Sequence, residues 1–252
     1  MRSLCLLLVL LGCSEPPSPA REALTQPAAP SVAADEVLLD QRGDARIVGR
    51  VEPAPPNGDP DRVLTLRGAG LDGRRALDAR FVGDRIVVLD SDHVLRVIDD
   101  AGEVELDRAV EAPLSVAGGA VAYVRGEMPF FEAARAVPAT GEVTAVADSI
   151  RPAWSPALSP DGARMVFATS APGRPRLYLP GRGYVDAPRV PTSPGGPVWL
   201  GDTLALADEA GVAFVDLSTG QVVRDEPELT ELVATADGAV LARRGDAYEV
   251  IR

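Results

Sequence analysis

Few residues in this sequence could do chemistry. In 252 residues there is one histidine, His93, and there are two cysteines, Cys5 and Cys13. Any nucleophile activated by histidine, and any multi-histidine metal site, would have to use His93. The sequence contains neither G-x-S-x-G nor H-E-x-x-H. We therefore predict no catalytic residue, no metal ligand and no cofactor.

Four aspartates, Asp90, Asp92, Asp99 and Asp100, lie near His93 at two expected turns. Carboxylate oxygens at this spacing could hold Ca²⁺. However, the series lacks the Asp-x-Asp-x-Asp-Gly ladder of a calcium loop, and aspartate favours turns because its side chain bonds the local backbone. We interpret these residues as turn formers, with a weak calcium site near Asp90 and Asp92 left open.

The segment GAGLDG, Gly68–Gly73, matches the G-x-G-x-x-G pattern of dinucleotide-binding folds and follows the apolar run RVLTL. Asp90 stands 17 residues beyond Gly73, near the place of a ribose-binding acid. A crossover helix would have to fit within 74–81, which allows only about two turns. We therefore interpret the segment as a turn between strands, although a helix after Gly73 would favour a dinucleotide enzyme.

The N-terminus has the form of an export signal. Arg2 precedes the apolar run 4–11, which is far too short to span a bilayer. The tetrad Leu-Leu-Gly-Cys that ends at Cys13 resembles the lipobox of bacterial lipoproteins, which implies cleavage before Cys13 and lipid attachment to its thiol. An ordinary signal peptide with a chance cysteine is the alternative. Ser14, by resemblance to the lipoprotein sorting rule, implies the outer membrane, facing the periplasm or the cell surface.

We expect three parts: a signal peptide over 1–12, a lipidated tether over 13–34 and one domain over 35–252. The tether is rich in Pro, Ala and Ser and cannot bury enough surface to offset its ordering entropy. The chain carries 25 basic residues, all arginine, against 37 acidic ones, and the net charge of −12 disfavours nucleic acid. We expect a monomer that binds an envelope protein or peptide and reaches the membrane through its lipid.

From residue 35 onward, short β-branched runs alternate with glycine-containing turns. Six of these turns align at separations of 40, 36, 43, 39 and 37 residues, and their glycines are Gly43, Gly83, Gly119, Gly162, Gly201 and Gly238. A period near 40 with about four strands per unit predicts an all-β fold, a β-propeller of about six four-stranded blades, with five or seven left open. Because only 14 residues follow Gly238, we expect the strand 35–40 to close the ring by completing the last sheet.

One unit carries a closer resemblance. SPDGARMVFATS, at 159–170, resembles the repeat of the TolB-like propellers, and RLYL, at 176–179, resembles the next strand of those blades. The other units keep the glycine and lose the Ser-Pro. The resemblance implies a β-propeller.

The long connection 180–197 is rich in Pro, Gly and Arg, and loops on rigid scaffolds often carry recognition. Arg182, Tyr184 and Arg189 are of types enriched in binding hot spots, so we predict this connection as the binding loop. The function predicted is a lipid-anchored, non-catalytic protein-binding or scaffolding module of the envelope. The alternative is an exported propeller enzyme, a hydrolase or lyase using carboxylates or a bound metal in the central channel.

Overall fold

The computed structural model of the chain describes residues 32–33, 35–53, 62–127, 130–146, 153–171, 174–189 and 196–251. The predicted signal peptide and nearly all of the predicted tether lie outside these residues. Within the described ranges every regular element is a β-strand, as the short β-branched runs predicted. No helix in this part of the chain has the length and apolarity needed to cross a membrane.

The described strands form five antiparallel sheets. The first sheet contains β1 (Glu36–Arg42), β2 (Ala45–Val51), β3 (Leu64–Arg67), β4 (Arg75–Val82), β5 (Arg85–Asp90), β6 (Leu95–Asp99) and β7 (Gly102–Asp107). The second contains β8 (Val110–Ala117), β9 (Ala120–Arg125), β10 (Glu132–Val137) and β11 (Glu142–Ala145). The third contains β12 (Ala153–Leu158), β13 (Met165–Ala171), β14 (Arg174–Leu179) and β15 (Gly183–Asp186).

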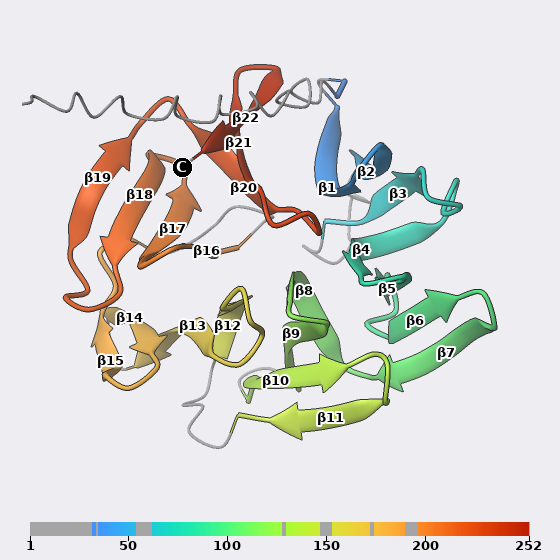
Figure 1. Cartoon of the computed structure of the whole chain (residues 1–252), viewed down its shortest axis with the longest axis horizontal. Helices are drawn as coiled ribbons and strands as arrows, with labels where there is room; N and C mark the ends of the chain where they lie inside the picture. The colour runs from blue at the N-terminus through green and yellow to red at the C-terminus, as the bar shows by residue number, and fades with distance from the viewer. Residues whose placement is uncertain are drawn as a thin grey trace, which may run out of the picture.

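The fourth sheet contains β16 (Val198–Leu200), β17 (Thr203–Asp208), β18 (Gly211–Asp216) and β19 (Val222–Glu226). The fifth contains β20 (Thr230–Ala234), β21 (Val240–Arg244) and β22 (Ala247–Ile251). Figure 1 shows these groups of strands following one another around a common centre in chain order. The all-β structure is therefore propeller-like, as predicted.

The predicted blade count holds only in part. Four groups have four strands, namely β4–β7, β8–β11, β12–β15 and β16–β19, whereas the described strands at either end form groups of three, β1–β3 and β20–β22. The first two groups also merge into one seven-stranded sheet, because β3 pairs with β4 through two residue pairs, Leu64 with Ala76 and Thr65 with Arg75.

The predicted closing role of residues 35–40 is wrong. β1 pairs along its length with β2, and no described strand bonds it into the sheet of β20–β22. The tight turn at Gly43 folds the chain straight back, so β1 finds its partner locally. The two ends of the ring meet instead through side-chain packing, with Leu38 and Val48 in one buried cluster with Val233, Leu241 and Tyr248, and through hydrogen bonds such as the one of 3.1 Å from the Ala236 N–H to the Gln41 carbonyl.

The SPDG motif forms the turn between β12 and β13, as predicted. The Ser159 Oγ donates to Asp161 at 2.5 Å and accepts from the Arg164 N–H at 2.9 Å. This hydroxyl and the Ala163 N–H lower the pKa of Asp161. Gly162 has a φ of +69° and lies so close to the neighbouring blade that a Cβ there would stand 2.7 Å from the Ala117 carbonyl oxygen. Glycine is therefore required both for the turn and for the close approach of two blades.

Aromatic side chains pack between the sheets. Phe167 is fully buried, and Trp199 and Phe214 are almost so. The Trp199 indole Nε1 donates to the Ala157 carbonyl at 3.1 Å, so its polar atom is satisfied within the core. These residues are core wedges between blades.

Candidate functional site

The innermost strands have a shared irregularity. The pairing register shifts within β1, β4, β8, β12 and β20, which are the first strands of their groups. A bulge re-aims side chains and backbone groups out of the regular ladder. Here it turns them toward the neighbouring blade, along the wall of the central channel.

Asp40, at the bulge of β1, links three blades. One carboxylate oxygen accepts the Phe81 N–H of β4 at 2.8 Å, and the other accepts the Ala236 N–H beyond β20 at 2.9 Å. The second oxygen also accepts the Gln41 N–H at 2.6 Å. The side chain is fully buried, and this desolvation raises the pKa of Asp40 to about 6 against the lowering effects of Arg80 and the three N–H donors.

Asp78 repeats this arrangement one blade further on. It accepts the Ala79 N–H at 2.8 Å and, across the blade boundary, the Leu114 N–H at 2.8 Å. It also forms a buried ion pair with Arg80, whose Nε lies 3.0 Å from the carboxylate. The remaining guanidinium nitrogen of Arg80 donates to the Leu39 carbonyl of β1. Both charges are therefore paired and hydrogen-bonded, which buried charges require.

A weaker form of the same link joins the next blades. The Ser115 Oγ of β8 accepts the Leu158 N–H of β12 at 3.0 Å, and the Ala157 carbonyl accepts from Trp199 of β16. Hydrogen bonds thus link successive groups of strands from β20–β22 through β1–β3 to β16–β19. None of these links was predicted from the sequence, although an aspartate inside an apolar run, as in EVLLD and ALDAR, was the available signal.

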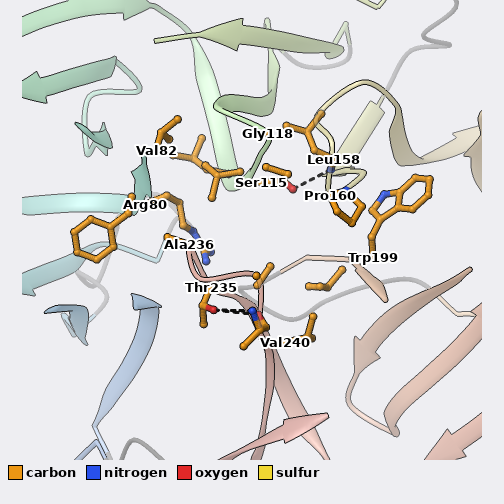
Figure 2. A pocket seen from close by; sticks show the side chains of 18 of the residues that line it. Arg80, Val82, Ser115, Gly118, Leu158, Pro160, Trp199, Thr235, Ala236 and Val240 are labelled. Carbon is orange, nitrogen blue, oxygen red and sulfur yellow. Dashed lines mark hydrogen bonds between the residues drawn. The ribbon is translucent and has the colours of Figure 1, made fainter. Parts of the chain in front are cut away.

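A cavity of about 190 Å³ lies in the channel (Figure 2). Its walls come from the ends of five inner strands and the turns that follow them, represented by Arg80, Ser115, Leu158, Trp199 and Thr235. Most of the lining is apolar or glycine. The polar side chains in it are already bonded: Arg80 to Asp78 and Leu39, Ser115 to the Leu158 N–H, and Thr235, whose hydroxyl accepts the Ala239 N–H at 3.1 Å. We call this cavity and its bordering turns the channel mouth.

Exposed acids surround the channel mouth. Five of the six aligned turns between the first and second strands of a group carry one aspartate each, and all five are exposed: Asp44, Asp84, Asp161, Asp202 and Asp237. Neighbouring turns are joined, since the Gly43 N–H donates to Asp237 at 2.7 Å and Arg42 donates to the Gly83 carbonyl. The rim is therefore a connected and negatively charged collar.

The channel carboxylates are not placed as free acids or bases. Asp40 and Asp78 both use their oxygens for backbone N–H groups, and Asp78 also holds Arg80. Among the described residues, no group of three or more His, Cys, Asp or Glu side chains is arranged to hold a metal ion. Geometrically, the channel mouth is suited to receiving a side chain.

A second concavity lies at the other end of the strands. It is bordered by the β5–β6 turn, the β7–β8 connection, the β9–β10 turn and the start of β12. In an antiparallel sheet these turns lie opposite the β4–β5 and β8–β9 turns that border the channel mouth. This groove has a volume of about 760 Å³ and is open to solvent. We call it the rim groove.

The structure describes only part of the predicted binding loop 180–197. Part of 180–197 is the strand β15, and residues 190–195 lie outside the described residues. Arg182 is exposed and donates to the Ser218 carbonyl of the next blade. Tyr184 packs in an aromatic cluster, with its ring centroid 5.3 Å from that of Tyr178.

Arg189 is the third predicted residue and is mostly buried. Its guanidinium contacts Asp208 at 3.0 Å and Asp225 at 2.5 Å, so it ties the β15–β16 connection to the following blade. Its environment is that of a structural ion pair. Cys13, the predicted lipid-bearing residue, lies outside the described residues.

The two alternative motifs are now accounted for. Gly68–Gly73 form the connection between β3 and β4, and β4 begins at Arg75 where a dinucleotide fold would need a helix. Asp90 is held by Arg74 at 2.8 Å and by Arg96 at 2.6 Å. His93 lies in the β5–β6 turn with a φ of +62°, and its backbone N–H donates to the Asp90 carbonyl. These residues are turn and strand-end residues, as the favoured interpretation had it.

Sheets arranged around a channel, with successive inner strands bonded blade to blade, define a propeller-like all-β protein. The structure is similar to that of TolB from Acinetobacter baumannii, with a TM-score of 0.49 and 16% identity. That match covers 81% of this chain and 62% of the TolB chain, so this chain spans less than two thirds of the TolB chain. It is also similar to the computationally designed Ika8 protein, with a TM-score of 0.47, 14% identity and coverage of 84% and 69%. No family model and no curated protein matches the sequence.

Proposed function

We propose that this protein is a protein-binding module of the bacterial envelope that receives a partner at the channel mouth and is anchored by lipid on Cys13. The observation that carries the binding role is the cavity of about 190 Å³ with apolar walls, satisfied polar groups and an acidic collar. Ligand pockets for small molecules commonly measure about 300–1,000 Å³. The channel mouth is smaller and suits one or two side chains at the tip of a partner loop.

The chemistry of the site defines the partner's contact. Because the wall groups are already hydrogen-bonded, an entering side chain gains most by being apolar. The five collar aspartates favour arginine or lysine beside it, and they would increase the association rate at low salt. The partner is thus a protein that presents an apolar side chain flanked by basic residues.

A photo-crosslinking amino acid at Val116, which lines the cavity, is expected to capture a discrete envelope protein in cells. The same probe at Val104, which is 68% exposed on β7, is the control and should give no such product. Replacing Asp84 and Asp202 by asparagine should lower the yield of the Val116 product about five- to thirtyfold, since each lost charge contact contributes about 0.5–1 kcal/mol. The matched charge change Asp100→Asn with Glu209→Gln should leave the yield unchanged. Equal yields from both double variants would contradict binding at the channel mouth.

Cys13→Ala is expected to move most of the protein from the membrane pellet to the soluble envelope fraction. A single acyl chain gives marginal membrane binding, whereas two or more hold a protein through washing. Cys5→Ala is the matched control and should stay in the membrane fraction, because the proposed cleavage removes Cys5. Recovery of Cys13→Ala in the same pellet as the wild type would contradict the anchor. Flotation of the wild type with outer-membrane markers tests the location.

A further inference from the structure

The rim groove has features that the channel mouth does not share. Its inner wall is apolar and partly aromatic, with Val124 and Ala153 buried and with Phe131 and Trp154 half-buried at its edge. Phe130, next to Phe131, is 63% exposed, which is unusual for phenylalanine. Exposed apolar surface beside an open groove marks an interaction site more often than a packing defect.

The charges on the rim groove are unevenly balanced. Asp92, Glu111 and Glu127 line it together with one arginine, Arg108. Arg108 is already paired with Glu105, since two of its guanidinium nitrogens lie 2.6 Å from the two carboxylate oxygens. The charge that the groove presents is therefore predominantly negative.

His93 also borders the groove and faces an acid. Its Nδ1 lies 3.0 Å from the Val110 carbonyl and 3.4 Å from the Glu111 carboxylate. The imidazole is thus held against the groove wall. Asp92 and Glu127, which also line the groove, are both exposed.

We propose that the rim groove is a second binding site, which takes an extended peptide segment of a partner protein with an aromatic side chain flanked by arginine or lysine. The volume of about 760 Å³ accommodates several residues of such a segment. The aromatic side chain packs on Phe131 and Ala153, and the cationic groups lie near Asp92 and Glu127. The face of Trp154 offers a cation–π contact to one of them.

The site is independent of the channel mouth. The two are bordered by turns at opposite ends of the strands, so one partner on each would not compete for space. A protein that holds two partners on opposite faces acts as an adaptor. This inference rests on the groove alone and stands whether or not the channel mouth binds anything.

The test uses the full chain carrying Cys13→Ala and end-blocked nonapeptides with Arg-Phe-Arg or Glu-Phe-Glu at the centre of a Gly/Ser sequence. Binding is measured by calorimetry and by the fluorescence of the two tryptophans, of which Trp154 borders the groove. The basic peptide should bind and the acidic one should not. Asp92→Asn with Glu127→Gln should weaken binding about five- to tenfold, as two lost charge contacts predict. Both residues are exposed, so the fold is expected to survive, and circular dichroism checks this.

Two further variants locate the binding. Trp154→Phe should remove the fluorescence change while reducing affinity less than the double charge variant does, because it keeps an aromatic face. Asp84→Asn with Asp202→Asn, at the channel mouth, should leave the affinity unchanged. Equal binding of the acidic and basic peptides, or loss of binding only in the channel-mouth variant, would contradict the rim-groove site. Neither outcome would bear on the proposed lipid anchor or on the fold.

Discussion

Asp40→Ala is expected to lower the free energy of unfolding by about 1–3 kcal/mol. The change leaves the buried Phe81 N–H without its acceptor, which costs about 1–3 kcal/mol, and it also removes the carboxylate that the partly buried Gln41 N–H and the Ala236 N–H bond. The loss should appear as an earlier midpoint in urea or guanidinium unfolding.

Asp44→Ala is the matched control, because Asp44 is an exposed residue of the adjoining turn. It should change stability by less than about 0.5 kcal/mol, as surface substitutions usually do. A midpoint for Asp40→Ala as high as that of Asp44→Ala would show that the ring does not depend on the buried carboxylate.

The same residue gives the stability a pH dependence of defined sign. Burial raises the pKa of Asp40 to about 6 from its ordinary value of 3.8, so between these values the folded chain binds a proton that the unfolded chain does not. The contribution of Asp40 to the free energy of unfolding therefore falls as the pH rises from about 4 to about 6 and is level above about 7. The free energy of unfolding of the wild type minus that of Asp40→Asn should thus be larger at pH 4.5 than at pH 7.5. A difference independent of pH would contradict the raised pKa.

Asp78→Ala is expected to destabilise the protein by about 3–5 kcal/mol, the usual cost of leaving one partner of a buried ion pair uncompensated. Arg80 has a side chain only 4% exposed and would lose the carboxylate with which it forms its ion pair. The Leu114 N–H would also lose its acceptor across the blade boundary. Chemical unfolding measures the change.

The double variant Asp78→Ala/Arg80→Met tests how much of the stability lost in Asp78→Ala comes from the unpaired charge of Arg80. It removes the stranded cation and should recover at least about 1 kcal/mol relative to Asp78→Ala. Glu105→Ala breaks an exposed pair with Arg108 and should cost less than about 1 kcal/mol. A double variant less stable than Asp78→Ala would mean that Arg80 stabilises the fold through contacts other than this ion pair.

Local chemistry made some of the fold predictable. The turn at Gly162 follows from SPDG itself, because the serine, aspartate and glycine act on backbone groups within five residues of one another. Strand content follows in the same way from β-branched runs. The blade repeat was visible because similar turns recur at a similar period.

The sites were less predictable because they depend on residues far apart in sequence. Asp40 and Ala236 are 196 positions apart and meet only when the ring closes. Arg189 is of a residue type that is enriched at recognition surfaces. Its contacts nevertheless depend on Asp208 and Asp225, which belong to the next blade. Closure by residues 35–40 failed for the converse reason, since a nearby hairpin partner was available to β1.

The hydrogen bonds of Asp40 couple the shape of the channel to the joint between the two ends of the ring, which is the contact between β1–β3 and β20–β22. Phe81 and Ala236, which it holds together, both line the cavity, and they come from opposite sides of that joint. A partner that contacts both walls binds only the closed ring, so by mass action it raises the free energy needed to part the two ends. Occupancy of the channel mouth would then be measurable at a distance from it, as slower hydrogen exchange of the Phe81 and Ala236 amides.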